Sequence, residues 1–389
     1  MRILHTSDWH LGRSFHGEDL LAAQRAYVDH LIHTVETEDV DLVVVSGDVY
    51  DRALPPVDAV ALADDAFTRL ASSRARVVII SGNHDSARRL GFSSRLVDAA
   101  GVHLRTDAGR VHEPIVLHDE HGPVAVYAIP YLEPDVLKHA WDLPTRSHSA
   151  ALTEAMRRIR ADLAGHPPGT RSVVMAHAFV AGGLPSESER DIAVGGVSVV
   201  PLELFDGIDY TALGHLHGRA TLADAVRYSG SPLAYSFSEA GHVKGSWLVD
   251  LDAHGLGDAR FVEAPVARRL ACLQGTLEDL LTASRFAAHE DCWVQATLTD
   301  AVRPVQAMER LRARFPHALA LRFVPAGGAE PPARPATTGK SAHRIALDFV
   351  GHVRGTPASS EESELLRHAL ECCSEDPDLV VGRDAVVSG

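Results

Sequence analysis

The stretch VVIISGNHD, from Val77 to Asp85, joins four β-branched residues to a polar cluster through a Ser-Gly pair. β-Branched residues favour strands, and a run that is apolar at every position is typical of a strand buried on both faces. Gly-Asn alone is ordinary turn chemistry. The segment therefore predicts a buried strand that ends at Gly82, and it leaves open whether Asn83 and His84 do more than turn the chain.

The residues before this stretch repeat its pattern. RILHTSD and DLVVVSGD are expected to be strands, and LLAAQRAYVDHLIHTVETE and VDAVALADDAFTRLASS have the apolar periodicity of helices. Strands and helices that alternate at this interval indicate a layered α/β domain. Ligands of such domains bind at the carboxyl ends of the strands, which is where the polar residues lie.

Further apolar runs follow from about Arg110, with fewer helical patterns between them. The runs are VHEPIVLHD, GPVAVYAIPYL, TRSVVMAHAFV, DYTALGHLHG and AVRYSGSPLAYS. They predict a second sheet, so that residues 1–264 form a two-sheet sandwich flanked by helices. Residues 265–326 have the pattern of a small βαβαβ module, with expected strands ARRLACLQG, CWVQATLTD and ALALRFVP.

The last part of the chain is expected to be a linker followed by a short helical tail. AEPPARPATTGKSAH is rich in Pro, Ala and Thr, and it places an extended linker at residues 327–344. RIALDFVGHV is interpreted as a short strand. Ser359 and Glu362 fit a capping box that starts a helix in SSEESELLRHALECC, within a C-terminal segment of residues 345–389. An apolar stripe at helical spacing runs along that helix: Leu365, Leu366, Ala369, Leu370 and Cys373.

The composition limits the class of protein. The 37 basic and 52 acidic side chains give a net charge of −15, which argues against a broad surface that coats nucleic acid. It allows an enzyme whose acidic side chains hold metal ions that meet phosphates. The four cysteines lack C-x-x-C spacing and are interpreted as reduced thiols. The first residues do not resemble a signal peptide and no apolar run is long enough to span a membrane, so we expect a cytoplasmic protein.

Metal-ligand side chains end five of the predicted strands. A lone Asp in such a place is usually a helix cap, and a lone His is more often a hydrogen-bonded structural residue. All five together are not expected by chance, and oxygen and imidazole ligands without thiolate suit Mn²⁺, Fe²⁺ or Zn²⁺. The candidates are Asp8, His10, Asp48, Asp51, Asn83, His84, His177, His215 and His217.

The number of candidates is sufficient for two metal ions. Two ions about 3.5 to 4 Å apart are the usual arrangement for phosphoester hydrolysis, and a carboxylate shared by both offsets their repulsion. Asp48 is the candidate for that bridge. Asp8 and His10 are two residues apart on a segment expected to be extended, so both should point the same way, as should His215 and His217. A glycine precedes several ligands and should let the backbone approach the site: Gly47, Gly82 and Gly214.

The series D-x-H, GDxxDR, GNHD, a single His and GHxH resembles the signature of the calcineurin-like metallophosphoesterases. The resemblance implies that His84 is the catalytic histidine and that Asp51 orients its imidazole. It also implies two ligand sets that share one carboxylate. The first ion would be held by Asp8, His10, Asp48 and His217, and the second by Asp48, Asn83, His177 and His215.

Other motifs resemble one branch of that family, the SbcD nuclease subunits of bacterial SbcCD complexes. They are HTSDWHLGRSF, GLPSESERDIAVGG, YTALGHLHG and RYSGSPLAYSFSE, and the βαβαβ module lies where SbcD proteins have a capping domain. The resemblance implies a nuclease with two Mn²⁺ ions, other divalent metals being possible. Its activities would be 3′-to-5′ exonuclease on double-stranded DNA and endonuclease on single strands and hairpins, in DNA end processing, repair and recombination. Its partner would be the ATPase SbcC, in a heterotetramer that contains a homodimer of this chain.

Two other functions stay open at this point. One is a small-substrate phosphatase or cyclic-nucleotide phosphodiesterase, and the other is a DNA-end-binding scaffold with a structural metal site. The C-terminal helix either docks onto the coiled coil of SbcC or packs on its own domain. Several side chains near the predicted metals are candidates for contacting DNA phosphates or bordering the DNA path: Arg13, His16, Arg88, Arg89, Ser188, Glu189 and Arg190.

Overall fold

The computed structural model describes residues 1–189, 199–326, 340–354 and 356–375. The chain divides into two compact units. The first comprises Met1–Thr297 with Val305–Arg322, and the second comprises Leu298–Pro304 with Phe323–Gly389. The domain boundaries inferred from the sequence remain predictions. None of the helices in the described ranges is long and apolar enough to cross a membrane.

The first six-stranded sheet contains the segment VVIISGNHD. Strand β5 (Arg76–Ile80) pairs in parallel with β4 (Leu42–Ser46) and β6 (Val102–Arg105), and β4 pairs in parallel with β1 (Arg2–Thr6). Two later strands, β13 (Gly245–Asp252) and β14 (Gly255–Glu263), extend this sheet beyond β1, and β13 runs antiparallel to it. The carboxyl ends of β1, β4 and β5 therefore lie side by side.

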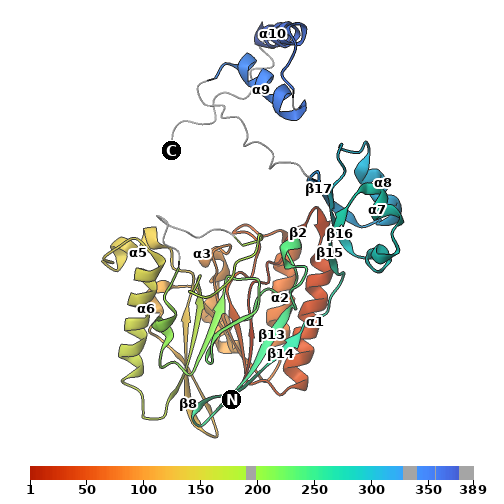
Figure 1. The fold of residues 1–389 in the computed structure, drawn as a ribbon. Coiled ribbons are helices and arrows are strands. Elements are labelled where there is room, and N and C mark those ends of the chain that lie inside the picture. The colour runs from red at the N-terminus through yellow and green to blue at the C-terminus, as the bar shows by residue number, and fades with distance from the viewer. Residues whose placement is uncertain (190–198, 327–339, 355, 376–389) are drawn as a thin grey trace. The chain divides into compact units, whose positions relative to one another are not determined.

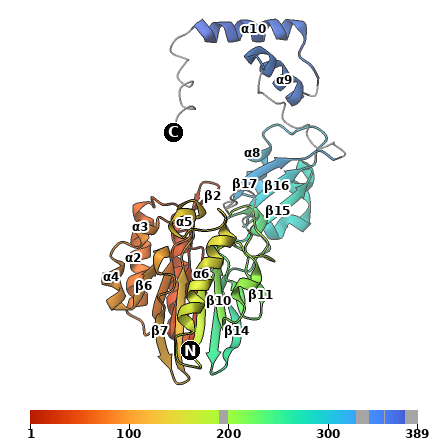
Figure 2. The ribbon, with the colours of Figure 1, turned by 90° about the vertical axis from the view of Figure 1, so that its left-hand side faces the viewer.

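The second six-stranded sheet forms from the later runs, as the sequence predicts. Its strand order is β11-β12-β10-β9-β8-β7, and β8, β9 and β10 are parallel. Figures 1 and 2 show the two sheets face to face, with α1 and α2 on one side of the sandwich and α6 on the other. The strands are β7 (Ile115–Asp119), β8 (Gly122–Ile129), β9 (Arg171–His177), β10 (Tyr210–Gly214), β11 (Ala220–Ala223) and β12 (Val226–Tyr228). This arrangement confirms the predicted α/β sandwich.

The alternation of side chains along β4 shows why the fold has four layers. Val43 and Val45 pack with the helical layer of α1 and α2, whereas Leu42 and Val44 pack between the two sheets. Both faces of β4 are therefore covered. Helix α1 buries an apolar face whose residues recur every three or four positions, as expected of an amphipathic helix.

The remaining elements of the sandwich are short, apart from the three covering helices. The covering helices are α1 (Leu21–Thr37), α2 (Val57–Ala71) and α6 (His148–Leu163). The short helices are α3 (Ala87–Leu90), α4 (Ser94–Val97) and α5 (Pro134–Ala140), and the short hairpin joins β2 (Ser14–Phe15) and β3 (Glu18–Asp19). Short 3-10 helices occur at Asp98–Ala100, Ala108–Arg110, Leu202–Phe205 and Phe237–Glu239, and a further one lies in the later module at Ser284–His289.

The small βαβαβ module forms with the predicted order of elements. Its three-stranded sheet has the order β15-β16-β17. An aromatic cluster joins the module to the sandwich, since Phe15, Tyr235 and Phe237 pack with Leu270 and Trp293. The elements are β15 (Leu270–Gly275), α7 (Leu277–Thr282), β16 (Trp293–Leu298), α8 (Ala307–Arg314) and β17 (Ala318–Phe323).

The C-terminal part corrects one prediction and supports another. RIALDFVGHV is not a strand but lies in helix α9 (Ala342–Arg354), whose first turn is capped because Ser341 Oγ accepts a hydrogen bond from the Arg344 N–H. Ile345 and Phe349, four residues apart, also suit a helix. The last residues of the predicted linker thus belong to α9, and residues 327–339 lie outside the described ranges.

Helix α10 (Ser360–Glu375) begins with the predicted capping box. The Ser359 N–H donates to Glu362 Oε2 at 2.7 Å, and the Glu362 N–H donates to Ser359 Oγ at 3.2 Å. Leu365, a member of the predicted apolar stripe, is exposed. The apolar stripe is therefore accessible to solvent at Leu365.

We expect Arg171→Met to destabilise the sandwich, because Arg171 is a buried cation at the end of the sandwich where β9 begins. Its guanidinium donates to Asp119, to the Gly122 carbonyl and to the Asp252 carbonyl. Removal of one partner of a buried ion pair costs about 3 kcal/mol or more in the free energy of unfolding. Urea denaturation measures the change.

The matched control is Arg157→Ala, which removes an arginine that forms an exposed ion pair with Glu154 on α6. That variant should unfold at the same urea concentration as the unmodified protein. Equal stability of the two variants would contradict the assigned role of Arg171.

Candidate metal centre

Backbone hydrogen bonds bring the segments after β1 and β4 together. The Asp8 N–H donates to the Gly47 carbonyl and the His10 N–H donates to the Asp48 carbonyl, each at 3.0 Å. Ser46 Oγ also donates to the Ala212 carbonyl of β10, at 2.9 Å, which ties the two sheets at this edge. The polar residues of both sheets therefore meet at one end of the sandwich.

The segment after β1 reaches this position in an unexpected conformation. Asp8 and His10 have φ values of 53° and 45°, and Asp48 and His215 have φ values of 50° and 104°. The prediction that Asp8 and His10 lie on an extended segment is therefore wrong, because β1 ends at Thr6 and the chain turns through left-handed conformations. Residues other than glycine rarely adopt such conformations, and those that do are concentrated at functional sites.

The first group of candidate ligands comprises Asp8, His10 and His217. Each offers one ligand atom, all within 4.8 Å of one another, and all three side chains are buried. The two Nε2 atoms of His10 and His217 lie 3.0 Å apart. Two imidazole nitrogens bound at right angles to one ion, each about 2.1 Å from it, would be about 3.0 Å apart. This spacing fits a shared metal ion.

The second group contains His177 and Asn83. His177 Nδ1 lies 2.9 Å from the Ser46 carbonyl, which can only accept, so Nδ1 carries the ring proton and Nε2 bears a lone pair. That Nε2 is 2.9 Å from Asn83 Oδ1, a second acceptor. His215 also lies here, with its ring centroid 5.3 Å from that of His177. Two acceptors that face each other fit a cation.

Asp48 lies between the two groups. Its Oδ2 is 3.6 Å from His10 Nε2 and 3.5 Å from His177 Nε2, and the side chain is buried. The structure thus brings all seven predicted ligands to one edge and places Asp48 where a bridging carboxylate would be needed. The metal roles themselves remain predictions.

Burial determines the protonation of these groups. Burial lowers the pKa of His177 to about 3 and lowers the pKa of His10 and His215 well below the usual value, so these imidazoles are neutral at pH 7. Burial also raises the pKa of the Asp8 carboxyl. Neutral imidazoles are the form that binds metal ions.

His84 lies beside the two groups, and its ring is held by the backbone. Its Nδ1 donates to the Asp51 main-chain carbonyl at 2.7 Å, and its Nε2 is 4.0 Å from Asp48 Oδ2. Asp51, which is predicted to orient the His84 imidazole, thus contacts it through its main-chain carbonyl and not through its carboxylate. The Asp51 carboxylate lies 3.5 Å from Arg13 Nη1.

Close backbone packing at this edge requires glycine at two positions. A Cβ atom on Gly82 would lie 2.1 Å from Asp48 Oδ1, and one on Gly214 would lie 1.9 Å from the Ser46 carbonyl oxygen. Asp85 joins two loops, since its carboxylate accepts from the N–H groups of Val49, Tyr50 and Gly82. Asp85 thus orders the segments that bear Asp48 and Asn83.

The candidate DNA-contacting residues have several partners within the protein. Arg13 donates to the Ser188 carbonyl and its guanidinium stacks over the Tyr235 ring, while Arg89 donates to the Ala53 carbonyl. Arg88 and His16 are exposed. Arg190 lies outside the described residues.

The loop that holds Ser188 and Glu189 contacts His217, which the sequence did not predict. Ser188 Oγ lies 2.6 Å from His217 Nδ1, and Glu189 Oε1 accepts from the His217 N–H at 2.8 Å. That the loop borders the DNA path remains a prediction. Glu239 and Lys244 were not singled out at all, and both are buried close to His217. Glu239 ends the polar motif RYSGSPLAYSFSE and Lys244 lies five residues beyond it, and neither position reveals burial.

Several solved structures resemble this chain at low identity. A novel archaeal phosphodiesterase is 12% identical with a TM-score of 0.30, and the match covers 68% of this chain and 99% of that chain. A dimetal phosphatase from Danio rerio is 14% identical with a TM-score of 0.38, and the match covers 68% and 99%. The protein TT1561 of Thermus thermophilus is 15% identical with a TM-score of 0.39, and the match covers 67% and 98%.

Two family models match separate parts of the chain. The SbcD C-terminal model, described as the type 5 capsule protein repressor C-terminal domain, matches residues 266–344, which include the βαβαβ module. A model described as calcineurin-like phosphoesterase matches residues 1–219, which contain every predicted ligand. Since that second match covers more than half of the 389 residues, the chain belongs to the calcineurin-like phosphoesterase family.

Proposed function

We propose that this protein is the Mn²⁺-dependent DNA nuclease subunit of an SbcCD complex. The family is one of metal-dependent phosphoester hydrolases, and the SbcD C-terminal match favours the nuclease branch. The observation that carries the proposal is the pair of ligand groups that meet at Asp48, with His84 beside them. The substrates are double-stranded ends, cut in the 3′-to-5′ direction, and single strands or hairpins.

The ligands divide between two ions. One ion would be held by Asp8, His10, Asp48 and His217, and the other by Asp48, Asn83, His177 and His215. When bound, the two ions supply positive charge to the phosphate and lower the pKa of water to the neutral range. Fixed carboxylates and neutral imidazoles would hold them in a buried site, where little reorganisation is needed during the reaction.

His84 is the catalytic residue of this proposal. Its Nδ1 proton is committed to the Asp51 carbonyl, so Nε2 is the ring atom that acts on the scissile phosphate. In its protonated form, Nε2 donates a hydrogen bond to a phosphate oxygen and then gives its proton to the leaving oxygen. Burial of the ring to 5% exposure keeps the imidazole in one place.

The partner is SbcC, bound by the C-terminal segment of residues 345–389. Exposed apolar side chains such as Leu365 on α10 and Phe349 on α9 suit a protein contact. Residues 357–389 carry 8 acidic and 2 basic side chains, so this tail suits a protein partner better than DNA. The proposal includes a homodimer within a heterotetramer.

His84→Gln should lower DNA cleavage about 100-fold to 10,000-fold while two Mn²⁺ ions still bind, because the substitution removes a proton donor but no predicted ligand. Cleavage of a labelled hairpin and a labelled duplex in Mn²⁺, with SbcC and ATP, measures the first effect. Calorimetric titration with Mn²⁺ measures the second. His33→Gln, which changes an exposed histidine on α1, is the control and should keep full activity. Full activity of the His84 variant would refute its role.

Removal of metal by a chelator should abolish cleavage, and added Mn²⁺ should restore it in the unmodified protein. In Asp48→Asn, Mn²⁺ should fail to restore cleavage and both ions should bind more weakly, since Asp48 is proposed to contact both. Asp29→Asn on α1 is a matched control because that carboxylate forms an exposed ion pair with Arg69. Loss of a single ion from the Asp48 variant would show that Asp48 is no bridge.

The substrate class can be tested with the same preparation. Hairpin, duplex and single-stranded DNA should be cleaved, and small phosphomonoesters and cyclic nucleotides should turn over far more slowly. The reason is that the βαβαβ module packs on the sandwich through Phe15 and Phe237, and an enzyme for small substrates has no evident need of such a module. Turnover of small esters far above that of DNA would replace the nuclease with a phosphatase, and absence of DNA cleavage with SbcC and ATP would refute the proposal.

A further inference from the structure

His217 follows the end of β10 and is held by side chains of two other segments. Its N–H donates to Glu189 Oε1 at 2.8 Å, and its carbonyl accepts from Lys244 Nζ at 2.8 Å. Its ring Nδ1 lies 2.6 Å from Ser188 Oγ. The ring Nε2 faces His10 at the candidate metal centre. Side chains from two other segments thus contact every polar atom of His217 except the one that faces the centre.

Counting protons in this network determines the tautomer of His217. Ser188 Oγ contacts both His217 Nδ1 and a carboxylate oxygen of Glu239, and a hydroxyl has one proton to donate. An ionised carboxylate can only accept, so the Ser188 proton is donated to Glu239. Ser188 Oγ then accepts from His217 Nδ1, which must carry the ring proton. The lone pair is therefore on Nε2, where a metal ion needs it.

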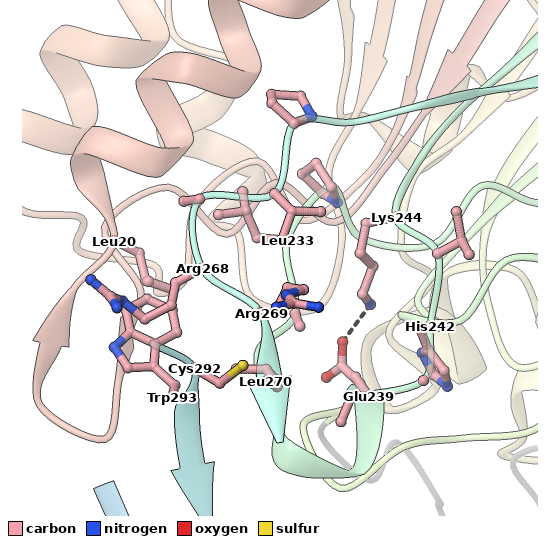
Figure 3. A pocket seen from close by; sticks show the side chains of 18 of the residues that line it. Leu20, Leu233, Glu239, His242, Lys244, Arg268, Arg269, Leu270, Cys292 and Trp293 are labelled. Atoms are coloured by element: carbon pink, nitrogen blue, oxygen red, sulfur yellow. Dashed lines mark hydrogen bonds and ion pairs between the residues drawn. The ribbon is translucent and has the colours of Figure 1, made fainter. Parts of the chain in front are cut away.

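Lys244 keeps Glu239 ionised. The two side chains form a direct ion pair, and Figure 3 shows them facing each other along a pocket of about 450 Å³. Both are buried, with Glu239 Oε1 on Ser188 and Oε2 on Lys244. Lys244 Nζ also donates to Ser231 Oγ at 3.0 Å. The three protons of the ammonium therefore have three acceptors: Glu239, Ser231 and the His217 carbonyl.

Stability alone does not account for such a pair. The desolvation of two buried charges offsets most of their attraction, and well-packed apolar residues of similar volume are often as stabilising. An arrangement that places a buried carboxylate, a hydroxyl and an ammonium around one histidine is better explained by what it does to that histidine. Carboxylates that orient metal-bound histidines through the second ring nitrogen act in this way in other metal sites.

We propose that Ser188, Glu239 and Lys244 are positioning residues that hold His217 in the tautomer and orientation required by the metal centre. The proposal rests on the proposed metal function of His217 and deepens it, because it assigns a role to three residues outside the predicted ligand set. Two neighbouring residues belong to the same network, since Ser186 Oγ lies 2.9 Å from Ser188 Oγ and Glu189 accepts from the His217 N–H at 2.8 Å.

Glu239→Gln is the decisive variant. A glutamine amide can donate to Ser188 Oγ, which would turn the Ser188 proton toward His217 Nδ1 and move the ring proton to Nε2. Histidine side-chain ¹H–¹⁵N spectra of the metal-free protein report the tautomer, and the His217→Gln variant identifies the signal. We expect the His217 signal to move from the Nδ1–H to the Nε2–H pattern. This measurement does not depend on nuclease activity.

Calorimetric titration with Mn²⁺ gives the second measurement. Glu239→Gln should bind one of the two ions about 10-fold to 100-fold more weakly and leave the other unchanged, because only one ligand group contains His217. Ser188→Ala should weaken the same ion by a smaller factor, since the nearby Glu239 carboxylate, 3.6 Å from Nδ1, can take over as acceptor. Glu113→Gln is the matched control, because it removes a carboxylate that forms an exposed ion pair with Arg110, and it should change neither measurement.

The outcomes separate this inference from the proposed function. An unchanged His217 spectrum together with unchanged Mn²⁺ affinity in Glu239→Gln would overturn the positioning role, even if the protein cleaves DNA. A changed spectrum and a selective loss of one ion would support it, even if DNA proves not to be the substrate. Should Glu239→Gln fail to fold, Ser188→Ala decides: unchanged affinity for both ions in that variant would overturn the role.

Discussion

The structure depends on the burial of many hydrogen-bond acceptors at one edge of a sandwich. The carboxylates of Asp8 and Asp48 and the imidazoles of His10, His177 and His217 are almost fully buried. Burial of such groups costs free energy of folding unless a cation or a hydrogen-bond donor contacts them. One close approach joins two acceptor atoms, His177 Nε2 and Asn83 Oδ1, at 2.9 Å, and the Nε2 atoms of His10 and His217 lie 3.0 Å apart, which is the spacing expected of ligands that surround cations. The groups at this edge are therefore arranged to bind cations.

The rest of the fold holds this edge in place. Strand β4 is covered on both faces, so the backbone that leads to Asp48 is fixed by packing on both sides. Backbone hydrogen bonds fix the segment after β1 to the segment after β4. The Asp85 carboxylate accepts from the Gly82 N–H and fixes that residue as well. The strained φ angles of Asp8 and His10 persist because these surroundings determine them. Rigid positioning of charged ligands is what a site for phosphoester hydrolysis requires.

A second layer of polar residues surrounds the ligands and sets their protonation. The Ser46 carbonyl holds His177, the Asp51 carbonyl holds His84, and Ser188 with Glu239 holds His217. In each case an acceptor on Nδ1 leaves Nε2 directed toward the centre. Two of these acceptors are main-chain atoms, which any sequence could supply. The third requires particular side chains, and it is therefore the one that a substitution can test.

The sequence by itself determined the α/β sandwich, the βαβαβ module and the ligand candidates, because strand periodicity and motif order are local properties of the chain. It failed where a short apolar run was compatible with two structures: residues 344–353 were expected to be a strand and lie in α9, where Ser341 caps the helix. It also assigned Asp8 and His10 to an extended segment. Only the tertiary structure decided that Asp48 lies between both ligand groups and that Ser188, Glu239 and Lys244 surround His217. The physical reason is that these contacts join residues from 22 positions apart (His217 and Glu239) to 129 positions apart (Asp48 and His177), and local patterns carry no information on such contacts.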